Sequence, residues 1–162
     1  MAITDGAKYN RTIVEEYFPD AIYIIDLYHA REHLHALHRI LCPDDSRHLD
    51  RWLTWLDAGK VTTLLNHARE LLPRSGKRRK AALKQIAYFD KNAHAMRYAH
   101  FRAQGLFVGS GVIEAGCRSL IGKRLKQSGM FWSVKGANAI IASRCCQFSG
   151  RFEDFWESIT AA

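Results

Sequence analysis

A short apolar run at residues 21–26 constrains the fold more than any other feature of the sequence. Five of its six residues are apolar, three of them are isoleucines, and the run ends in Asp26. Such a run predicts a strand buried on both faces, as in a parallel sheet covered by helices. A second strand is expected at residues 3–6, which include Asp5 and run into a turn. We therefore expect two strands, with Asp5 and Asp26 at their ends.

The rest of the chain has the apolar spacing of amphipathic helices. Residues 75–80 are expected to form a basic turn that enters a helix with Leu83, Ile86 and Ala87 inside. Asn92 is expected to cap the continuation of this helix. Further helices are expected at residues 7–18, 28–41, 49–56, 61–72, 111–125, 135–148 and 151–159. The 162 residues thus predict one domain with a short α/β start and a mostly helical body.

The net charge of +8 is unevenly distributed along the chain. Residues 74–144 contain fifteen lysines and arginines against two acids, Asp90 and Glu114, whereas the remainder of the chain is acidic. This asymmetry favours a polyanion such as nucleic acid as partner, because each cation that meets a phosphate releases condensed counterions. A solvated basic surface without a specific partner is the alternative.

Several classes of protein are disfavoured by composition. No apolar run approaches the roughly 20 residues of a membrane span, and the first residues lack the pattern of a signal peptide. Cys42, Cys117, Cys145 and Cys146 show no C-x-x-C spacing, which argues against a disulfide framework or a cysteine-rich zinc site. We therefore expect a cytoplasmic protein without a membrane partner.

Three acids stand at the ends of predicted elements. Asp5 and Asp26 follow strands, and Glu114 lies in the first turn of a helix. Carboxylates held in this way suit a two-metal phosphoryl-transfer site, because Mg²⁺ prefers hard oxygen ligands and the two ions flank the scissile phosphate. For Glu114 the alternative is an acid that stabilises the helix dipole, an effect worth about 0.3–1 kcal/mol.

Residues 29–33 match the HxxEH pattern of the inverted zinc peptidases. In that pattern two histidines one turn apart bind zinc and the glutamate activates water. A third ligand on a later helix would be required, and the acids there, such as Glu70, belong to solvated faces. Because the same helix also carries His35 and His38, a histidine-rich polar face is the simpler interpretation and a zinc peptidase the remote alternative.

The aromatic pair Phe131 and Trp132 is flanked by Lys126 and Lys135. Aromatic surface between cations suits stacking on unpaired bases while the cations follow the phosphate backbone. Core packing is the alternative for Trp132.

Three segments resemble the bacterial insertion-sequence transposases of the ISKra type. They are GSGVIEAGC at residues 109–117, RLKQSGMFW at 124–132 and GANAII at 136–141. Shorter stretches near both ends of the chain are similar to the same family, namely residues 5–7, 18–19, 26–34 and 149–157. The resemblance therefore covers nearly the whole chain.

This resemblance implies an RNase H-like DDE transposase core, in which two aspartates and one glutamate hold two Mg²⁺ or Mn²⁺ ions for DNA strand cleavage and joining. Asp5 is similar in position to the second aspartate and Glu114 to the glutamate. Asp26 and His29 resemble the acid-x-x-histidine element of the related Mutator-like transposases. We expect these two residues to support the site through contacts behind the metal ligands, with metal ligation by Asp26 as the alternative.

The same resemblance places the first catalytic aspartate on an earlier strand, and only four residues precede Asp5 here. The expected fold is therefore an α/β remnant, mostly α, of an RNase H-like core. Residues 1–27 are expected to be part of its sheet, residues 28–104 a helical insertion, and residues 105–162 the C-terminal helices. A chain lacking one metal-ligating acid is expected to cleave little or no DNA by itself. The alternative is a non-catalytic protein that binds DNA or interferes with an intact transposase.

The partners implied are transposon-end DNA, a second copy of the chain or an intact transposase, in the bacterial cytoplasm at the nucleoid. The residues expected to contact DNA are Lys77, Arg78, Arg79, Lys80, Arg118, Lys123, Arg124, Lys126, Trp132 and Lys135.

Overall fold

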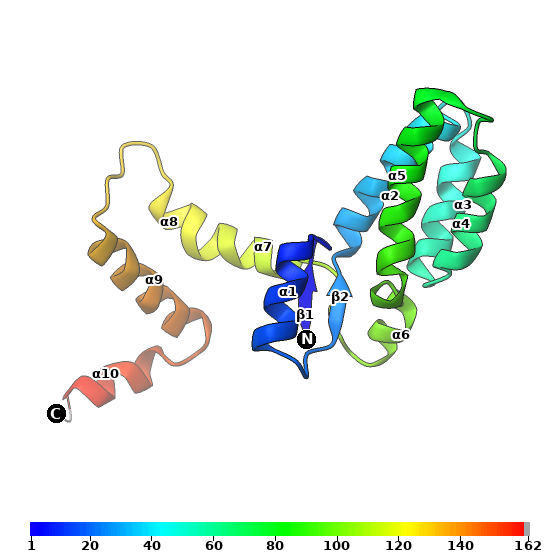
Figure 1. Ribbon diagram of the computed structural model, residues 1–162. Helices are drawn as coiled ribbons and strands as arrows, with labels where there is room; N and C mark the ends of the chain where they lie inside the picture. Colours follow the sequence, from blue (N-terminus) through cyan, green and yellow to red (C-terminus); the bar gives the residue numbers. More distant parts are fainter. Residues whose placement is uncertain (161–162) are drawn as a thin grey trace. The chain divides into compact units, whose positions relative to one another are not determined.

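The computed structural model describes residues 1–160, without the side chains of residues 155, 159 and 160. The chain divides into two compact units, Met1–Ser110 and Gly111–Ala162, and each is described by itself (Figure 1). Within the described residues, helices dominate and the sheet has two strands. The predicted mostly helical body after a short α/β start is thereby confirmed.

The first unit begins with a parallel pair of strands, β1 (Ala2–Thr4) and β2 (Tyr23–Ile25). Parallel strands require a crossover connection, and α1 (Lys8–Tyr17) supplies it and packs against β1. Adjacent residues of a strand point to opposite faces, yet Ile24 and Ile25 are both fully buried. The strand β2 is therefore covered on both sides, as its apolar sequence predicts.

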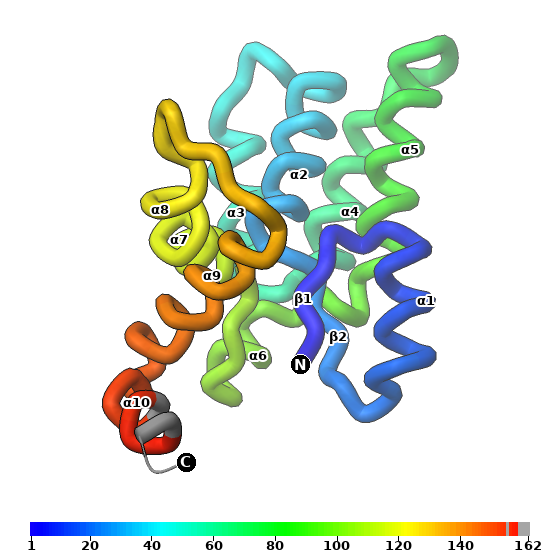
Figure 2. The backbone as a smooth tube through the Cα atoms, turned by 90° about the vertical axis from the view of Figure 1, so that its left-hand side faces the viewer, coloured from blue at the N-terminus to red at the C-terminus, as the bar shows by residue number. Residues whose placement is uncertain are grey.

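Four helices after β2 form a bundle (Figures 1 and 2). They are α2 (Leu27–Leu41), α3 (Ser46–Asp57), α4 (Val61–Glu70) and α5 (Gly76–Asn92). Each helix packs on the next, and α5 closes the bundle against α2. Amphipathic helices joined by short turns favour this arrangement, because every apolar stripe faces the same core.

Trp52 on α3 is the largest fully buried side chain of this core. Its indole Nε1 donates to Nδ1 of His67 on α4 over 2.9 Å. Burial, and next the charge of His48, lowers the pKa of His67, which favours the neutral ring that this hydrogen bond requires. The bond thus satisfies a buried indole N–H and ties α3 to α4.

The inner face of α5 differs from the prediction. Leu83 and Ala87 are exposed, whereas Ala82, Ile86 and Phe89 are buried. The prediction for Leu83 and Ala87 was wrong because α5 packs between α2 and α4, and the buried stripe follows that groove.

Asn92 also departs from its predicted role. It makes no capping hydrogen bond through its side chain at the start of the following 3₁₀ turn. Its Nδ2 instead donates to the carbonyl of Tyr88 over 2.9 Å, and the residue is buried.

The remaining elements follow α5 along the chain. The predicted helix over residues 111–125 is interrupted by a π-helical segment, and none of residues 111–148 is buried. None of the described helices has the length and apolar character that crossing a membrane requires. The elements are η1 (Ala93–Ala95), α6 (Tyr98–Ala103), α7 (Gly111–Cys117), η2 (Arg118–Gly122), α8 (Lys123–Leu125), α9 (Val134–Phe148) and α10 (Phe152–Thr160).

Candidate functional site

Asp5 and Asp26 lie at the same edge of the strand pair. The register pairs Thr4 with Ile25, and the amide of Asp26 donates to the carbonyl of Thr4 over 2.7 Å. The carboxyl ends of adjacent parallel strands therefore bring the two acids together, although 21 positions separate them. We call this region the carboxyl edge, and its functional candidates are Asp5, Asp26 and His29.

Asp26 is a buried carboxylate that caps α2. Its Oδ1 accepts hydrogen bonds from the amides of Tyr28 at 2.7 Å and His29 at 3.1 Å, and its Oδ2 accepts from the amide of Ser110 at 2.6 Å. Burial opposes ionisation, but the hydrogen bonds of Ser110, His29 and Tyr28 outweigh it and lower the pKa of Asp26. Both carboxylate oxygens are thus used to hold backbone.

The bond from Ser110 depends on a glycine beside it. The amide of Leu27 donates to the carbonyl of Val108 over 2.9 Å, so the segment ending at Ser110 runs along the start of α2. A Cβ on Gly109 would lie 2.9 Å from the ring of Tyr28. Only glycine fits there without displacing the aromatic ring, and this close approach lets Ser110 reach Asp26.

Asp5 is half-buried, and its carboxylate is used on one side. Oδ1 accepts from the amide of Ala7 at 2.8 Å and from the side chain of Asn10 at 2.9 Å. These two bonds lower the pKa of the Asp5 carboxyl, burial opposes them, and the charge of His29 lowers it further. Neither Ala7 nor Asn10 uses Oδ2, so Asp5 can present an ionised oxygen to a ligand.

A tyrosine from the bundle secures the backbone of Asp5. The hydroxyl of Tyr88 on α5 donates to the Asp5 carbonyl over 3.0 Å. Burial, and next the charge of Asp5, raises the pKa of Tyr88, which keeps this hydroxyl protonated. Gly6 turns the chain here with φ of +84°, and a Cβ on it would lie 3.2 Å from the Tyr88 ring. The turn after Asp5 is therefore packed directly on α5.

His29 and His33 lie on one face of α2, with ring centroids 5.1 Å apart. Nδ1 of His29 lies 3.2 Å from Oε2 of Glu32, and Nδ1 of His33 lies 2.7 Å from Oε1 of Gln85. His33 also stacks on Tyr88, with centroids 3.7 Å apart. Each histidine of the HxxEH pattern thus has a polar neighbour, which favours a hydrogen-bonded polar face.

The described residues include no group of three or more His, Cys, Asp or Glu side chains that could hold a metal ion. The zinc peptidase interpretation therefore has no third ligand in this part of the chain. At the carboxyl edge both oxygens of Asp26 accept hydrogen bonds from backbone amides. Asp5 is the acid whose Oδ2 neither Ala7 nor Asn10 uses, so this oxygen can bind a metal ion. The first unit by itself does not fit a complete two-metal site for Mg²⁺ or Mn²⁺.

Glu114 lies in the first turn of α7, in the second unit, and is exposed. An acid at this position stabilises the helix dipole whatever else it does. Ser110, which Asp26 holds, is the last residue of the first unit, and Glu114 follows it four positions later.

Two of the predicted DNA contacts have structural roles. Arg78 donates to the carbonyls of Ile40 and Leu41 at the end of α2, and Arg79 donates to the carbonyl of Pro73. These bonds satisfy carbonyls that a helix end and a turn leave without partners. The other predicted DNA-contacting residues are exposed, namely Lys77, Lys80, Arg118, Lys123, Arg124, Lys126, Trp132 and Lys135.

Sequence reasoning missed Tyr88, Asn10 and Ser110 as partners of the two aspartates. Asn10 lies only five positions from Asp5 and could have been considered. Tyr88 and Ser110 lie more than 80 positions from their partners, and no spacing in the sequence indicates these contacts. No protein-family model, curated protein or solved structure matches this chain.

Proposed function

We propose that this chain is the DNA-binding, C-terminal part of a DDE-type DNA transposase. In this proposal Asp5 and Glu114 are the metal-ligating acids of the chain, and Asp26 and His29 support them. The family chemistry is cleavage and joining of DNA strands, with Mg²⁺ or Mn²⁺ stabilising the charge that develops on the phosphate. The proposed partner is the DNA at the ends of the mobile element.

The observation that carries this proposal is the carboxyl edge. An aspartate follows each of the two parallel strands, and the two acids differ in their hydrogen-bond partners. Both carboxylate oxygens of Asp26 accept hydrogen bonds from the amides of Tyr28, His29 and Ser110. In Asp5, by contrast, Ala7 and Asn10 both donate to Oδ1 and neither donates to Oδ2. This difference supports a ligand role for Asp5 and a positioning role for Asp26.

The proposal includes little or no DNA cleavage by the chain alone. A two-metal site requires several hard oxygen ligands around each ion. The proposed ligands in this chain are the two acids Asp5 and Glu114, because the resemblance places the third acid of the site on an earlier strand.

A nicking assay tests the proposal. The purified chain is incubated with supercoiled plasmid carrying the DNA that flanks its gene, with Mg²⁺ and separately with Mn²⁺. We expect salt-dependent binding, because cations that neutralise phosphates release counterions, and no nicking above that of a protein-free control.

Two outcomes would contradict parts of the proposal. Absence of DNA binding at low salt would overturn it altogether. Metal-dependent nicking would overturn the expected inactivity. If that nicking disappeared in both Asp5→Ala and Glu114→Ala but persisted in Glu70→Ala, it would support the two acids as ligands.

A second candidate function is interference with an intact transposase. The observation that favours it is the apolar surface of the second unit, where Phe131 is 97% exposed and Val134 is 79% exposed. Contiguous exposed apolar patches mark surfaces that associate with another protein, and these two residues lie three positions apart.

Co-expression tests this second candidate. The chain is expressed with an intact transposase that carries similar segments, and transposition of a marked element is counted. We expect fewer transposition events with the unchanged chain and restored events with Phe131→Asp/Val134→Asp. Tyr9→Asp, an exposed aromatic in the first unit, serves as the control and should still interfere. Unchanged transposition with the native chain would contradict interference.

A further inference from the structure

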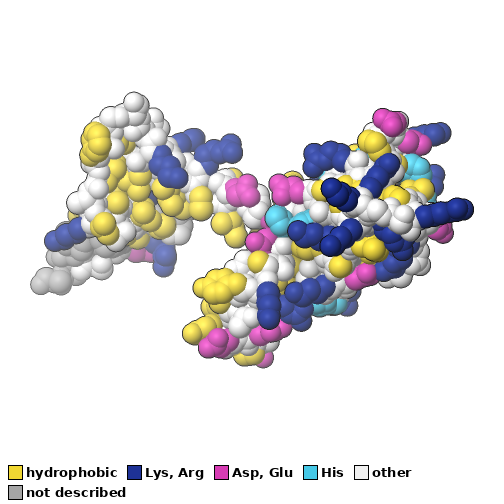
Figure 3. Space-filling view, turned by 45° about the horizontal axis from the view of Figure 1, so that its top comes forward, with side chains coloured by type: hydrophobic (Ala, Val, Ile, Leu, Met, Phe, Trp, Pro, Cys, Tyr) yellow, Lys and Arg dark blue, Asp and Glu magenta, His cyan; other side chains and the backbone are white. Residues whose placement is uncertain are grey.

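One face of α5 carries a row of lysines. Lys77, Lys80, Lys84 and Lys91 are all exposed, and steps of three, four and seven residues place them in one narrow stripe of a helix. The buried residues of α5 lie on the opposite side. At 1.5 Å per residue this lysine row is about 21 Å long. Figure 3 shows lysine and arginine side chains gathered over the bundle.

The other charged residues of α5 point elsewhere. Arg78 and Arg79 hold backbone carbonyls, and Asp90, the one acid in the α5 sequence, accepts two bonds of 2.7 Å from Arg69 of α4. The lysine row therefore has no acid of its own helix beside it. Tyr88 lies in the same stripe between Lys84 and Lys91, and its hydroxyl donates to the Asp5 carbonyl.

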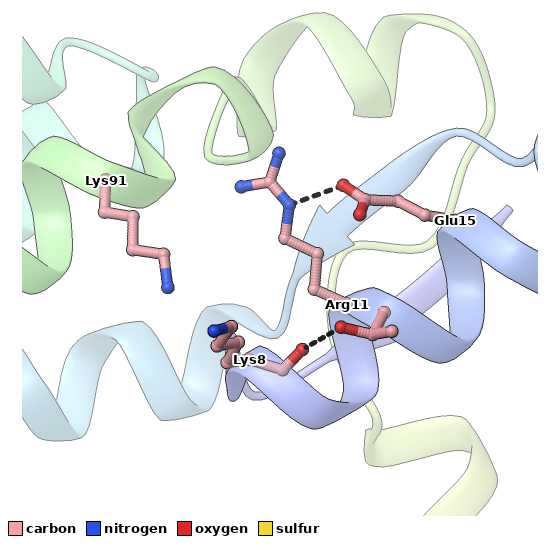
Figure 4. Close-up of a pocket in the computed structure, with 5 residues that line it drawn as sticks. Lys8, Arg11, Glu15 and Lys91 are labelled. Carbon is pink, nitrogen blue, oxygen red and sulfur yellow. Dashed lines mark hydrogen bonds and ion pairs between the residues drawn. The ribbon is translucent and has the colours of Figure 1, made fainter.

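The row ends at a hollow of about 300 Å³ between α1 and α5 (Figure 4). Lys8, Arg11, Thr12 and Glu15 of α1 line it together with Lys91 of α5. Nε of Arg11 donates to Oε1 of Glu15 over 2.7 Å, which leaves the two terminal amino groups of the guanidinium for another acceptor. Three cations and one acid around one hollow favour an anion within it.

The hollow lies beside the carboxyl edge. Lys8 follows Asp5 by three positions. Lys91 precedes Asn92, whose Nδ2 lies 3.2 Å from where a Cβ on Gly6 would be. The hollow therefore flanks the turn that holds the Asp5 carboxylate.

We infer that the lysine row and the hollow form one track for the phosphate backbone of DNA, which leads a strand to Asp5. This inference rests on the proposed function and deepens it, because it names which cations of the first unit meet phosphate. At a rise of 3.4 Å per nucleotide along the axis of a DNA duplex, a row of this length parallel to that axis spans about six phosphates of one strand.

The geometry favours nucleic acid over a lipid surface. A helix that lies in a membrane interface must bury an apolar face in the lipid. The apolar residues Ala82, Ile86 and Phe89 of α5 are already buried in the bundle. What α5 presents outward is a line of cations, which matches a polyanionic backbone.

Salt-dependent binding to a short DNA duplex of arbitrary sequence tests the track. Fluorescence anisotropy gives the association constant between about 50 and 200 mM salt, and the slope of its logarithm against log salt reports the number of phosphates that the protein neutralises. Lys80→Gln/Lys84→Gln should reduce the magnitude of this slope by about 2, and Lys8→Gln/Lys91→Gln should do the same, because each lysine that meets a phosphate adds about one unit to the slope. Arg39→Gln/Lys60→Gln removes the same charge from exposed sites outside the row and should leave the slope unchanged.

Arg78→Gln separates the track from the structural cations. We expect it to lower resistance to urea, because carbonyls at the end of α2 lose their donor, and to leave the salt slope unchanged. Equal slopes for the native chain and both track variants would overturn the track while native DNA binding still supports the proposed function. Absence of native binding would overturn both. Binding to phosphatidylserine vesicles but not to the duplex would replace DNA with a lipid surface.

Discussion

Replacing Trp52 with alanine is expected to lower the free energy of unfolding by about 3–5 kcal/mol. The indole is fully buried at the centre of the bundle. Its removal leaves a cavity that packed helices cannot close, and it leaves Nδ1 of His67 without the donor at 2.9 Å. Urea denaturation followed by circular dichroism measures the change.

Two matched variants locate the cause of this loss. Trp55→Ala removes the same side chain from a half-buried position, where the guanidinium of Arg51 lies 5.9 Å from the ring centroid, and should cost clearly less. Trp52→Phe keeps most of the apolar volume but removes the indole N–H. Its loss of stability should lie between those of Trp55→Ala and Trp52→Ala. A loss below about 1 kcal/mol for Trp52→Ala would be that of an ordinary surface position and would contradict the central role of this residue.

Replacing Asp26 with alanine is expected to lower the free energy of unfolding by about 2–4 kcal/mol. The change removes an N-cap and also the acceptor for Ser110, and it leaves three part-buried amide donors without their carboxylate. Hydrogen exchange at the amides of Tyr28, His29 and Ser110 should accelerate together, because one carboxylate protects all three. Asp26→Asn keeps one carbonyl oxygen as an acceptor, so its free energy of unfolding should fall by less than that of Asp26→Ala.

The native chain should show the matching pH dependence. The folded pKa of Asp26 is lowered from 3.8, so the folded state binds the proton less readily than the unfolded state. The stability contributed by Asp26 is then fully present above its unfolded pKa and is lost as the pH falls through the folded pKa. Urea midpoints measured below pH 5 should fall less steeply in Asp26→Ala than in the native chain.

Asp45→Ala is the control for a cap without a long-range partner. Asp45 caps α3 by accepting from the amide of Arg47, two positions away. Asp45→Ala should lower the free energy of unfolding by less than Asp26→Ala does. It should not affect hydrogen exchange at the amide of Ser110. An equal loss at both positions, or unchanged exchange at Ser110 in Asp26→Ala, would contradict the anchoring of Ser110 by Asp26.

Much of the fold follows from local patterns in the sequence. The run at residues 21–26 predicts β2 because isoleucines on both faces of a strand must be buried. Helical spacing predicts α2 and α4 to within a few residues at their ends. The choice of buried face on α5 could not be predicted for Leu83 and Ala87, because two neighbouring helices compete to define it.

The candidate site was predictable only in part. The sequence predicts that Asp5 and Asp26 follow strands, whereas the parallel pairing that brings them to one edge comes from the structure. The different use of the two carboxylates could not be predicted, because Tyr88 and Ser110 approach from distant parts of the chain. The roles of Arg78 and Arg79 were equally hidden, since a basic segment has the same composition whether its cations bind phosphate or cap a helix.

The sequence by itself determined the buried strand, the helical body and the asymmetry of charge, because each depends on residue types and spacing along the chain. Only the tertiary structure decided that Asp26 is committed to backbone amides while Asp5 keeps an oxygen free of Ala7 and Asn10. Only the tertiary structure showed that Arg78 and Arg79 donate to backbone carbonyls, whereas the lysines of the row are exposed. The physical reason is that hydrogen-bond partners and solvent-facing surfaces are set when distant segments pack together, and one-dimensional spacing does not record which segments meet.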